Sequence, residues 1–425
     1  MKVLKFGGTS VGSAQRMKEV AKLITDGERK IVVLSAMSGT TNTLVEISDY
    51  LYKKNPEGAN EIINRLETKY RQHIDELYAT PEYKQKGLEL IKSHFDYIRS
   101  YTKDLFTLFE EKVVLAQGEL ISTAMMNYYL QECGVKSVLL PALEYMRTDK
   151  NAEPDPVYIK DKLQVQLELH PDAEIYITQG FICRNAYGEV DNLQRGGSDY
   201  TASLIGAAVN ASEIQIWTDI DGMHNNDPRI VDKTSPVRHL HFEEAAELAY
   251  FGAKILHPTC IQPAKYANIP VRLLNTMDPT APGTLISNDT EKGKIKAVAA
   301  KDNITAIKIK SSRMLLAHGF LRKVFEIFES YQTSIDMICT SEVGVSVSID
   351  NTKHLNEILD DLKKYGTVTV DKDMCIICVV GDLEWENVGF EAKALDAMRD
   401  IPVRMISFGG SNYNISFLIR ECDKK

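Results

Sequence analysis

The first two dozen residues constrain the fold more than any other stretch of this chain. Val3–Phe6 has the composition of a short buried strand, and the pair Gly7-Gly8 follows it directly. Ala14–Ile24 then shows the apolar spacing of a helix. A glycine turn between a strand and a helix aims free backbone N–H groups at one point, and the helix N-terminus adds partial positive charge. We therefore expect an anion-binding turn, beside which Lys5 supplies a full positive charge.

This turn matches neither of two common phosphate-binding patterns. The dinucleotide pattern is G-x-G-x-x-G, and the P-loop pattern G-x-x-x-x-G-K-[ST] places its lysine after the glycines, whereas Lys5 precedes them. A glycine pair after a strand is, by itself, most often a simple tight turn. A functional interpretation therefore needs support from other motifs.

Composition limits the class of protein. The 425 residues predict about three domains, and 44% apolar residues are ample for a hydrophobic core. A net charge of −9 argues against nucleic acid and membrane surfaces as partners, because both attract clusters of Lys and Arg. No apolar run approaches ~18 residues and no secretory leader is recognisable, so we expect a cytoplasmic protein. The scattered cysteines predict reduced thiols, with Cys375 and Cys378 in a buried strand and no metal ligand among them.

Strands and helices alternate along the first two thirds of the chain. Strands are predicted at residues 30–36, 137–140, 174–178 and 213–217, and a helix at 198–209. Such alternation predicts an α/β fold with a mostly parallel sheet between helix layers, which binds ligands at the carboxyl ends of its strands. Residues 43–109 read as a mainly helical excursion interrupted before two prolines. The run Gln117–Thr123 reads as a polar turn that opens a helix, with Glu119 near the helix start.

The last third of the chain contains an internal repeat. A strand–helix–strand–strand pattern that begins with the strand at Thr305–Ile309 recurs about 70 residues later, beginning at Cys375–Val380. The pattern break near residue 288 separates this region from the rest. We predict one large domain over residues 1–288 and two tandem α+β modules over 300–372 and 373–425, the second completed by the strand 304–310.

A second glycine pair precedes a second helix. Arg195 offers a planar fork suited to a carboxylate, and Gly196-Gly197 opens an apolar helix whose first turn holds Ser198 and Asp199. This arrangement predicts another anion-binding helix N-terminus. The alternative is that Ser198 and Asp199 only cap the helix. The presence of Lys5 and its glycine pair elsewhere in the chain favours the functional interpretation.

With these motifs together, the chain resembles the aspartokinases of the amino acid kinase family. The resemblance rests on the stretches Lys5–Ser10, Ser35–Asn42, Gly118-Glu119, Arg195–Asp199, Trp217–Asp219, Asp227–Arg229, Phe251–Lys254 and His257-Pro258. It implies the amino acid kinase fold over 1–288 and phosphoryl transfer from ATP to the side-chain carboxylate of L-aspartate. The two C-terminal modules resemble the ACT domains that bind effector amino acids in this family.

The resemblance also implies roles for individual residues. Lys5, Asp199 and Arg195 form the catalytic set, in which Lys5 contacts the transferring phosphate and Asp199 orients Lys5. The nucleotide is implied to contact Lys5, Gly7, Gly8, Gly197, Thr218, Asp219, His224, Arg229 and Lys254. Aspartate is implied to contact Thr41, Glu119, Phe181, Arg195 and Ser198, with Glu119 suited to its α-ammonium group. Mg²⁺ is implied to sit on phosphate oxygens and waters, without protein ligands. His224 stands where related enzymes often carry a tyrosine, so its contact is a weak one.

An effector site in the first ACT module is also implied. The residues that resemble those of lysine-sensitive aspartokinases are Met314, Gly319, Phe320, Leu321, Asp336, Ser341 and Glu342. An aspartate at a strand end accepts an ammonium group, whereas Arg404 at the matching position of the second repeat repels it. We therefore expect L-lysine to bind the first module only and to inhibit, with threonine as the rival effector. Pairing of such modules by their edges predicts a homodimer or higher homo-oligomer.

Two other functions remain open at this point. The chain can be a different member of the same family, acting on glutamate, acetylglutamate, carbamate or UMP, because the phosphate-binding turns are shared. It can also be a catalytically inactive amino-acid sensor, although Lys5, Arg195, Asp199 and Lys254 are all present. Assay of several carboxylic substrates separates these possibilities.

Overall fold

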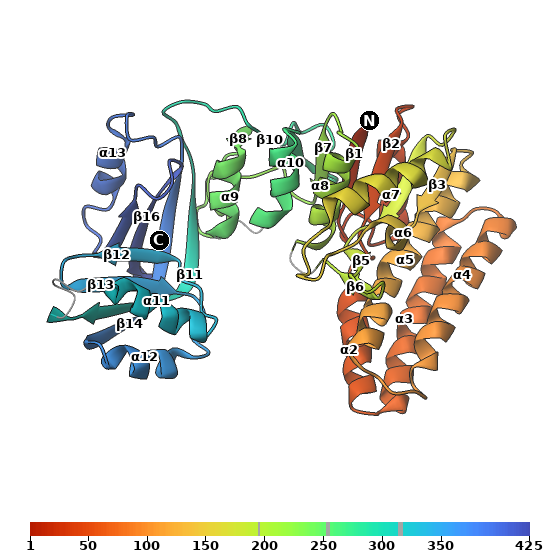
Figure 1. Cartoon of the computed structure of the whole chain (residues 1–425). Coiled ribbons are helices and arrows are strands. Elements are labelled where there is room, and N and C mark those ends of the chain that lie inside the picture. Colours follow the sequence, from red (N-terminus) through yellow and green to blue (C-terminus); the bar gives the residue numbers. More distant parts are fainter. Residues whose placement is uncertain (194–195, 252–255, 313–317) are drawn as a thin grey trace. The chain divides into compact units, whose positions relative to one another are not determined.

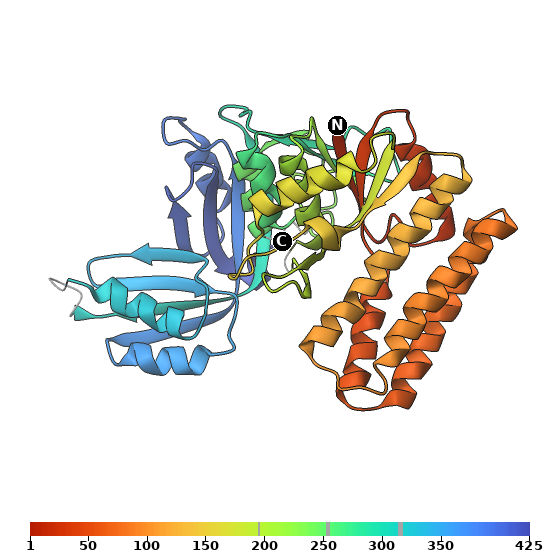
Figure 2. The same cartoon turned by 45° about the vertical axis from the view of Figure 1, so that its right-hand side comes forward.

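The computed structural model describes residues 1–193, 196–251, 256–312 and 318–425. The chain divides into two compact units, which we describe separately. The first consists of residues 1–223 with 256–288, and the second of residues 224–255 with 289–425. Figures 1 and 2 show the elements of both units from two directions. No helix in the described part of the chain combines the length and the apolar character needed to cross a membrane.

The first unit is built on a mostly parallel sheet, as the alternation of strands and helices predicts. Its strands lie in the order β3–β4–β2–β1–β7–β9–β10, and all neighbours are parallel except β9 and β10. The register puts Phe6 of β1 between Leu34 and Trp217 on its two neighbours, so these strands end level with one another. The strands are β1 (Lys2–Phe6), β2 (Lys30–Leu34), β3 (Ser137–Leu140), β4 (Ile175–Gln179), β7 (Ile214–Thr218), β9 (Val271–Asn275) and β10 (Thr284–Ser287).

Helices cover both faces of this sheet. Leu4 and Phe6 belong to the core on the face of α1 (Ala14–Ile24), whose N-cap Ser13 accepts a hydrogen bond from the Arg16 backbone N–H at 3.2 Å. Because side chains alternate along a strand, Lys5 points to the opposite face, where α8 (Gly197–Ala208) packs against β1. The remaining elements of the unit are α6 (Ala142–Tyr145), α7 (Pro156–Glu168), the hairpin β5 (Ile182–Arg184) and β6 (Val190–Asn192), a 3₁₀ turn (Pro258–Ile261) and α10 (Gln262–Tyr266).

The expected helical excursion is an array of four long helices that lie side by side in Figures 1 and 2. Two of the breaks fall where the prolines predict, because Pro56 and Pro81 each occupy the first turn of a helix. Tyr70 and Phe95 are fully buried between the helices, and the Tyr70 hydroxyl lies 2.7 Å from Thr40 Oγ1. The helices are α2 (Thr40–Tyr52), α3 (Pro56–Leu77), α4 (Pro81–Ser100) and α5 (Leu108–Glu132).

The prediction of a polar turn at Gln117–Thr123 is wrong. Helix α5 runs without interruption through this stretch, so Glu119 lies near its middle. The helix is buried on most sides, and buried polar residues such as Ser122 replace the apolar stripe that marks an amphipathic helix. Gly118 marks close packing here, because a Cβ at this position would lie 2.8 Å from Ala36 Cβ in the turn after β2.

The second unit contains an antiparallel six-stranded sheet in the order β12–β13–β11–β14–β16–β15. Its strands are β11 (Ile295–Lys310), β12 (Met337–Thr340), β13 (Gly344–Ile349), β14 (Thr367–Gly381), β15 (Val403–Phe408) and β16 (Asn414–Arg420). Its helices are α11 (Phe320–Ser330), α12 (Leu355–Lys363) and α13 (Phe390–Ala397), and it also holds the short strand β8 (His239–His241) and α9 (Phe242–Tyr250). The repeated strand–helix–strand–strand order matches the expected pattern. Helix α12, between β13 and β14, was not part of that pattern.

The two repeats share their central strands. Strands β11 and β14 pair along nearly their whole lengths, with register shifts on either side of Ile304. The half of β11 at 304–310 pairs with the start of β14 and with β13 of the first repeat. The other half of β11, residues 295–301, pairs with the part of β14 that belongs to the second repeat. The expected partner of that part, the strand 304–310, does not lie there. The sequence analysis recognised only the second half of β11 as a strand, although residues 295–301 are equally apolar. Cys375 and Cys378 lie buried in β14, as predicted, and burial raises the pKa of each thiol to about 12.

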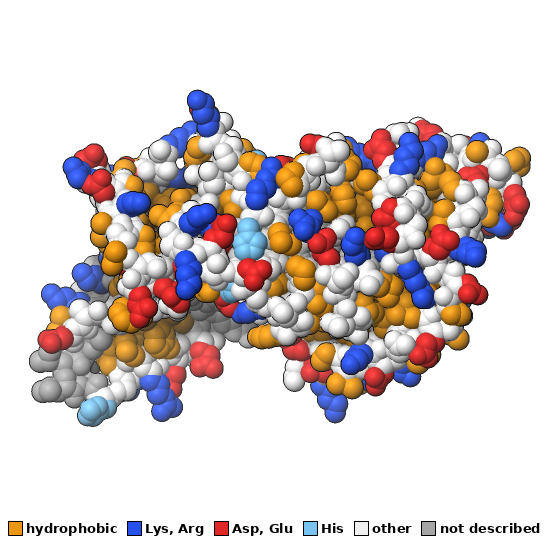
Figure 3. Space-filling model, turned by 90° about the horizontal axis from the view of Figure 1, so that it is seen from above, with side chains coloured by type: hydrophobic (Ala, Val, Ile, Leu, Met, Phe, Trp, Pro, Cys, Tyr) orange, Lys and Arg blue, Asp and Glu red, His pale blue; other side chains and the backbone are white. Residues whose placement is uncertain are grey.

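Charged side chains of both signs are interspersed over the face shown in Figure 3. On α4, Lys86 lies 2.7 Å from Glu82 and Lys92 lies 2.6 Å from Asp96, each one helical turn apart. Exposed pairs of this kind contribute little to stability, because water screens the charges. The stability of the helical array therefore comes mainly from its apolar core.

Two glycines fasten the loop after β7 to the hairpin of β9 and β10. A Cβ at Gly222 would lie 2.3 Å from Thr284 Oγ1, and one at Gly283 would lie 1.8 Å from the carbonyl oxygen of Leu273. Both glycines have positive φ, +68° and +65°. The Met223 backbone N–H also donates to Thr284 Oγ1 at 2.9 Å. The loop after β7 is therefore held by backbone approaches that any side chain would prevent.

We expect Gly283→Ala to destabilise the protein by more than about 2 kcal/mol, because it adds a backbone clash to the cost of a left-handed alanine. Gly134→Ala is the matched control, since Gly134 has φ +78° and no atom within 4 Å of the added Cβ. The control should lose only about 1 kcal/mol. Urea unfolding followed by circular dichroism measures both, and equal losses would contradict the proposed close approach.

Candidate active site

The turns that follow β1, β2, β4 and β7 meet at the carboxyl edge of the first sheet. Gly8 lies against the turn after β2, because an added Cβ would lie 3.0 Å from the carbonyl oxygen of Ala36. The Ser38 backbone N–H donates to the Gly8 carbonyl oxygen at 3.2 Å. The predicted anion-binding turn is thus packed backbone to backbone against its neighbour, and a side chain at Gly8 would press against the Ala36 carbonyl.

Lys5 and Asp199 form an ion pair at this edge. Lys5 Nζ lies 2.8 Å from Asp199 Oδ1, and the two side chains are only 11% and 16% exposed. A Cβ on Gly7 would lie 3.5 Å from the same Nζ, so the ammonium group sits beside the glycine turn. Asp199 occupies the first turn of α8, which begins after Gly196. The structure therefore brings both glycine turns and one ammonium–carboxylate pair to a single place.

A line of hydroxyl groups adjoins this pair. Ser35 Oγ donates to Ser198 Oγ at 2.9 Å, and Ser122 Oγ donates to the Ser35 carbonyl oxygen at 2.8 Å. Gly180, after β4, lies so close that an added Cβ would be 2.4 Å from Ser198 Oγ. Ser122 was not among the predicted site residues. Its signal was the unexplained run of hydroxyl residues within an otherwise apolar helix.

Phe181 adopts a left-handed backbone conformation, with φ +70°. Its backbone N–H donates to Thr201 Oγ1 of α8 at 2.9 Å. A Cβ on Gly197 would lie 3.4 Å from the Phe181 ring, so the ring covers the start of α8. Positive φ is rare for a bulky aromatic residue, and such strain concentrates at functional sites.

Glu119 is a buried carboxylate with an incomplete set of partners. Its Oε1 accepts a hydrogen bond from the Ala36 backbone N–H at 3.4 Å, whereas its Oε2 has no hydrogen-bond partner among the described residues. Burial raises the pKa of Glu119 to about 7, against smaller opposing effects of backbone hydrogen bonds. Thr41, another predicted substrate residue, lies partly exposed in the first turn of α2, which packs against α5. A cation near Oε2 would favour the charged form of Glu119.

The end of β7 is tied to the turn after β1. The Thr276 backbone N–H and Oγ1 both donate to the Thr218 carbonyl oxygen at 2.8 Å, and Thr276 Oγ1 lies 3.2 Å from Ser10 Oγ. The rings of Phe6 and Trp217 stack at 5.6 Å. Thr276 follows the neighbouring strand β9 and was not predicted from sequence. Thr218 and Asp219 therefore lie at the same edge as Lys5.

Cys260 packs beneath the second glycine turn. Gly196 has φ +79°, and a Cβ there would lie 1.8 Å from Cys260 Sγ. Burial, and next the negative charge of Asp199, raise the pKa of the Cys260 thiol to about 12. The thiol therefore stays protonated and acts as packing. His257, just before it, accepts from the Thr259 backbone N–H as the cap of the 3₁₀ turn, which agrees with a structural role.

Other predicted residues belong to the second unit or fall outside the described residues. Arg195, Lys254 and Met314 lie outside the described residues. His224 and Arg229 belong to the second unit, where His224 Nδ1 lies 2.9 Å from Thr234 Oγ1 and Arg229 forms a two-pronged ion pair with Asp227. The Arg229 side chain is 71% exposed, and this pairing lowers the pKa of Asp227.

The predicted effector residues spread along the first repeat. Asp336 immediately precedes β12, while Ser341 and Glu342 follow its other end. Five residues of extended strand span about 16 Å, so these two groups do not surround one point within a single chain. Gly319 caps α11, Phe320 is buried, and Leu321 is exposed on the same helix. In the second repeat, Arg404 Nε lies 2.8 Å from Asp371.

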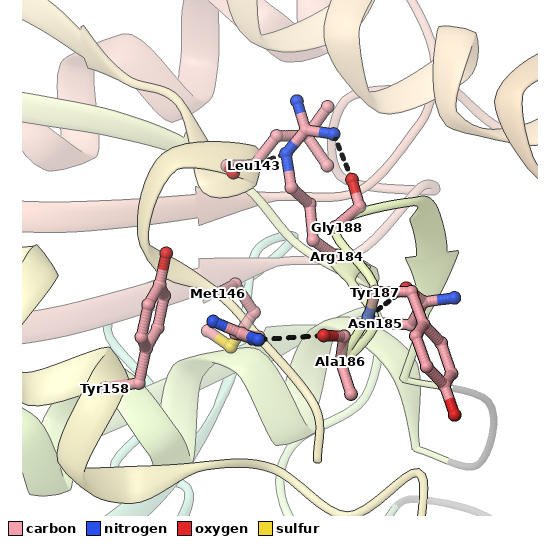
Figure 4. Close-up of a pocket in the computed structure, with 9 residues that line it drawn as sticks. Leu143, Met146, Tyr158, Arg184, Asn185, Ala186, Tyr187 and Gly188 are labelled. Atoms are coloured by element: carbon pink, nitrogen blue, oxygen red, sulfur yellow. Dashed lines mark hydrogen bonds between the residues drawn. The ribbon is translucent and has the colours of Figure 1, made fainter. Parts of the chain in front are cut away.

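A cavity of about 240 Å³ in the first unit contains none of the predicted residues (Figure 4). It lies between the β5–β6 hairpin and the segment around α6. Its two arginines donate to backbone carbonyls, Arg147 to Ala186 at 2.8 Å and Arg184 to Leu143 and Gly188 at 3.0 and 2.7 Å. The bonds from Arg147 to Ala186 and from Arg184 to Leu143 hold the hairpin to its neighbours, whereas the bond from Arg184 to Gly188 lies within the hairpin.

Known proteins share these features. The model of the amino acid kinase family matches residues 1–275, and an ACT domain model matches residues 377–425. Aspartokinase 1 of Arabidopsis thaliana, a chloroplast protein, is 36% identical over 99% of this chain and 78% of its own length.

Solved structures give the same result. Aspartokinase III of Escherichia coli in complex with aspartate and ADP has a TM-score of 0.83 and 31% identity, over all of this chain and 97% of that one. The same protein in complex with lysine and aspartate has a TM-score of 0.80 and 32% identity, over all of this chain and 96% of that one. The expected fold, an amino acid kinase region followed by ACT modules, is confirmed. The chain belongs to the aspartokinases of the amino acid kinase family.

Proposed function

We propose that this aspartokinase transfers the γ-phosphoryl group of MgATP to the side-chain carboxylate of L-aspartate, giving 4-phospho-L-aspartate. The observation that carries the proposal is the Lys5–Asp199 pair between two glycine turns, a fixed positive charge surrounded by backbone N–H groups. The complex of the Escherichia coli enzyme with aspartate and ADP supports this choice of substrates.

The reaction needs little covalent help from the protein. A carboxylate with a reference pKa near ~4 is already ionised at pH 7, so no general base is required. The task is to align two anionic groups and to neutralise the charge that accumulates between them. We propose that the transferring phosphate contacts Lys5, Gly7, Gly8 and Gly197. Asp199 holds Lys5 in position. The nucleotide is assigned to Thr218, Asp219, His224, Arg229 and Lys254.

Aspartate has two carboxylates and one ammonium group to be recognised. We assign the carboxylates to Arg195 and Ser198, with Phe181 and Thr41 bordering the substrate. The ammonium group is assigned to Glu119, because its Oε2 is buried and accepts no hydrogen bond from the described residues. Such a carboxylate is costly unless a cation pairs with it.

Mg²⁺ fits the proposal as a companion of the nucleotide. Within the described residues no group of three metal-binding side chains occurs. Mg²⁺ keeps several waters and binds phosphate oxygens readily, so it can enter with ATP and neutralise phosphate charge.

Regulation and assembly complete the proposal. We propose that L-lysine inhibits the enzyme by binding at Asp336 in an ACT module over residues 300–372, with 373–425 as the second module and 1–288 as the catalytic domain. The complex of the Escherichia coli protein with lysine supports this effector. The separation of Asp336 from Ser341 and Glu342 favours a site that a second subunit completes, hence a homodimer or larger homo-oligomer. The free cysteines favour a cytoplasmic location.

The direct test supplies ATP, Mg²⁺ and hydroxylamine with aspartate, glutamate or acetylglutamate. Acyl phosphates react with hydroxylamine to give coloured hydroxamates, which we expect with aspartate only. A signal with glutamate but not aspartate would place the chain in another branch of the family. No signal with any acid would favour an inactive sensor.

Lys5→Met should lower kcat by on the order of 10² or more, because the charge acts on the transition state. Lys2→Met is the matched control on the same strand, since the Lys2 side chain is partly exposed and forms an ion pair only with Glu28 among the described residues. The control should keep parental turnover, and circular dichroism verifies that both variants fold. Near-normal turnover in Lys5→Met would leave Lys5 as a structural residue.

Aspartate binding should depend on the charge of Glu119. Because the pKa of Glu119 is raised to about 7, the free protein holds a proton there below pH 7 and must release it to accept an ammonium group. We therefore expect kcat/KM for aspartate to fall about tenfold per pH unit below pH 7 and to level off above it. Glu119→Gln should weaken aspartate binding and flatten this profile. An unchanged profile in the variant refutes the assignment.

A further inference from the structure

The carboxylate of Asp336 is already bound by a lysine of its own chain. Lys301 Nζ lies 2.8 Å from Asp336 Oδ1 and 2.9 Å from Asp350 Oδ2. The same Nζ lies 4.5 Å from the centre of the Tyr250 ring. The Tyr250 hydroxyl donates to Asp336 Oδ1 at 2.7 Å. Two carboxylates and one aromatic ring thus surround a single ammonium group, and we call these three residues the ammonium cage.

The ammonium cage is closed in this structure. The Asp336 side chain is 1% exposed, and its Oδ2 has no hydrogen-bond partner among the described residues. Burial alone would lower the pKa of Lys301, but hydrogen bonds to Asp336 and Asp350 raise it above its usual value, so the group stays charged. Any ammonium group from solution therefore reaches Asp336 only if Lys301 moves away.

The chemistry of the cage defines what can replace Lys301. Two carboxylates and the face of a tyrosine are the partners that a primary ammonium group on an alkyl chain prefers. Free L-lysine carries this same group at its ε-position. Threonine and methionine carry no side-chain cation.

We propose that Lys301 is an internal competitor of the effector: its ammonium group occupies the cage that the side-chain ammonium of L-lysine takes when it binds. This inference rests on the proposed lysine regulation and adds the residue that sets the effector's affinity and selectivity. The cost of displacing Lys301 weakens binding, so the enzyme responds only when lysine is abundant.

Displacement of Lys301 also affects the hydrogen bond of Tyr250. Tyr250 is the last residue of α9, which packs on β11 and β14. Four residues further along the chain stands Lys254, to which the proposed function assigns the nucleotide. An effector at Asp336 would thus lie beside Tyr250, the residue that ends α9 and that precedes Lys254 in the sequence.

The test is calorimetric titration of L-lysine into the full-length protein and its Lys301→Ala variant. Removing the competitor and its charge should tighten lysine binding tenfold or more, and should lower the half-inhibitory concentration by the same factor. Lys308→Ala is the matched control, because Lys308 lies exposed on the same strand β11. The control should bind lysine as the parent does. Unchanged or weaker binding in Lys301→Ala overturns the proposal.

Norleucine tests the chemistry, because it has the shape of lysine without the ε-ammonium group. Norleucine should bind both the parent and Lys301→Ala more weakly than lysine does. Equal affinities for norleucine and lysine would contradict the ammonium cage. If Lys301→Ala fails to fold, Lys301→Gln removes the charge with less loss of packing and should also bind lysine more tightly.

Kinase activity without added lysine is measured in the same preparations. If the parent phosphorylates aspartate and the variant binds lysine as the parent does, the role of Lys301 as competitor is rejected and the proposed catalytic function stands. Absence of activity on aspartate in the parent rejects the proposed catalytic function instead. Tight lysine binding that appears only in Lys301→Ala supports the proposal, since it shows that Lys301 closes the cage.

Discussion

The ion pair of Lys5 and Asp199 organises the catalytic edge of the first unit. The two residues are far apart in sequence, yet each stands beside a closely packed glycine turn, in which Gly8 lies against the backbone of Ala36 and Gly196 against the side chain of Cys260. An ammonium group so little exposed is stable only with a carboxylate beside it. The pair therefore connects β1 to the first turn of α8. The hydrogen bond from Ser35 to Ser198 adds a second connection to the start of α8.

Asp199, Asp336 and Glu119 are carboxylates with little exposed side-chain surface, and they differ in their cation partners. Asp199 pairs with Lys5, and Asp336 pairs with Lys301. Glu119 has only a weak hydrogen bond from backbone, and burial raises its pKa to about 7. The first two each have a lysine of the same chain as partner, whereas Glu119 Oε2 has no hydrogen-bond partner among the described residues. Our proposals rest on this difference: Glu119 is proposed to receive the ammonium group of the substrate, and Asp336 is proposed as a site where a ligand must compete with Lys301.

Most of the fold was predictable because its signals are local. Strand β1, helix α1 and the helix starts at Pro56 and Pro81 follow from apolar spacing, glycine turns and proline, each readable within a few residues. Glu119 was assigned to a helix start, because a fully buried helix has no amphipathic stripe. Contacts such as Thr276 to Thr218, or Lys301 to Asp336, join residues that only the folded chain brings together. The candidate site was therefore predictable as a set of motifs, but not its supporting hydrogen bonds.

Strand β11 serves both repeats of the second unit. Its residues 295–301 lie beside one half of β14 and its residues 304–310 beside the other, while β13 pairs with the latter part alone. Although the sequence reads as two modules in tandem, the backbone hydrogen bonds of each depend on a strand that enters the other. Exchange of a single module between related chains would therefore cut through a shared strand. Duplication and recombination in such proteins are constrained to move the six-stranded sheet as one inherited block.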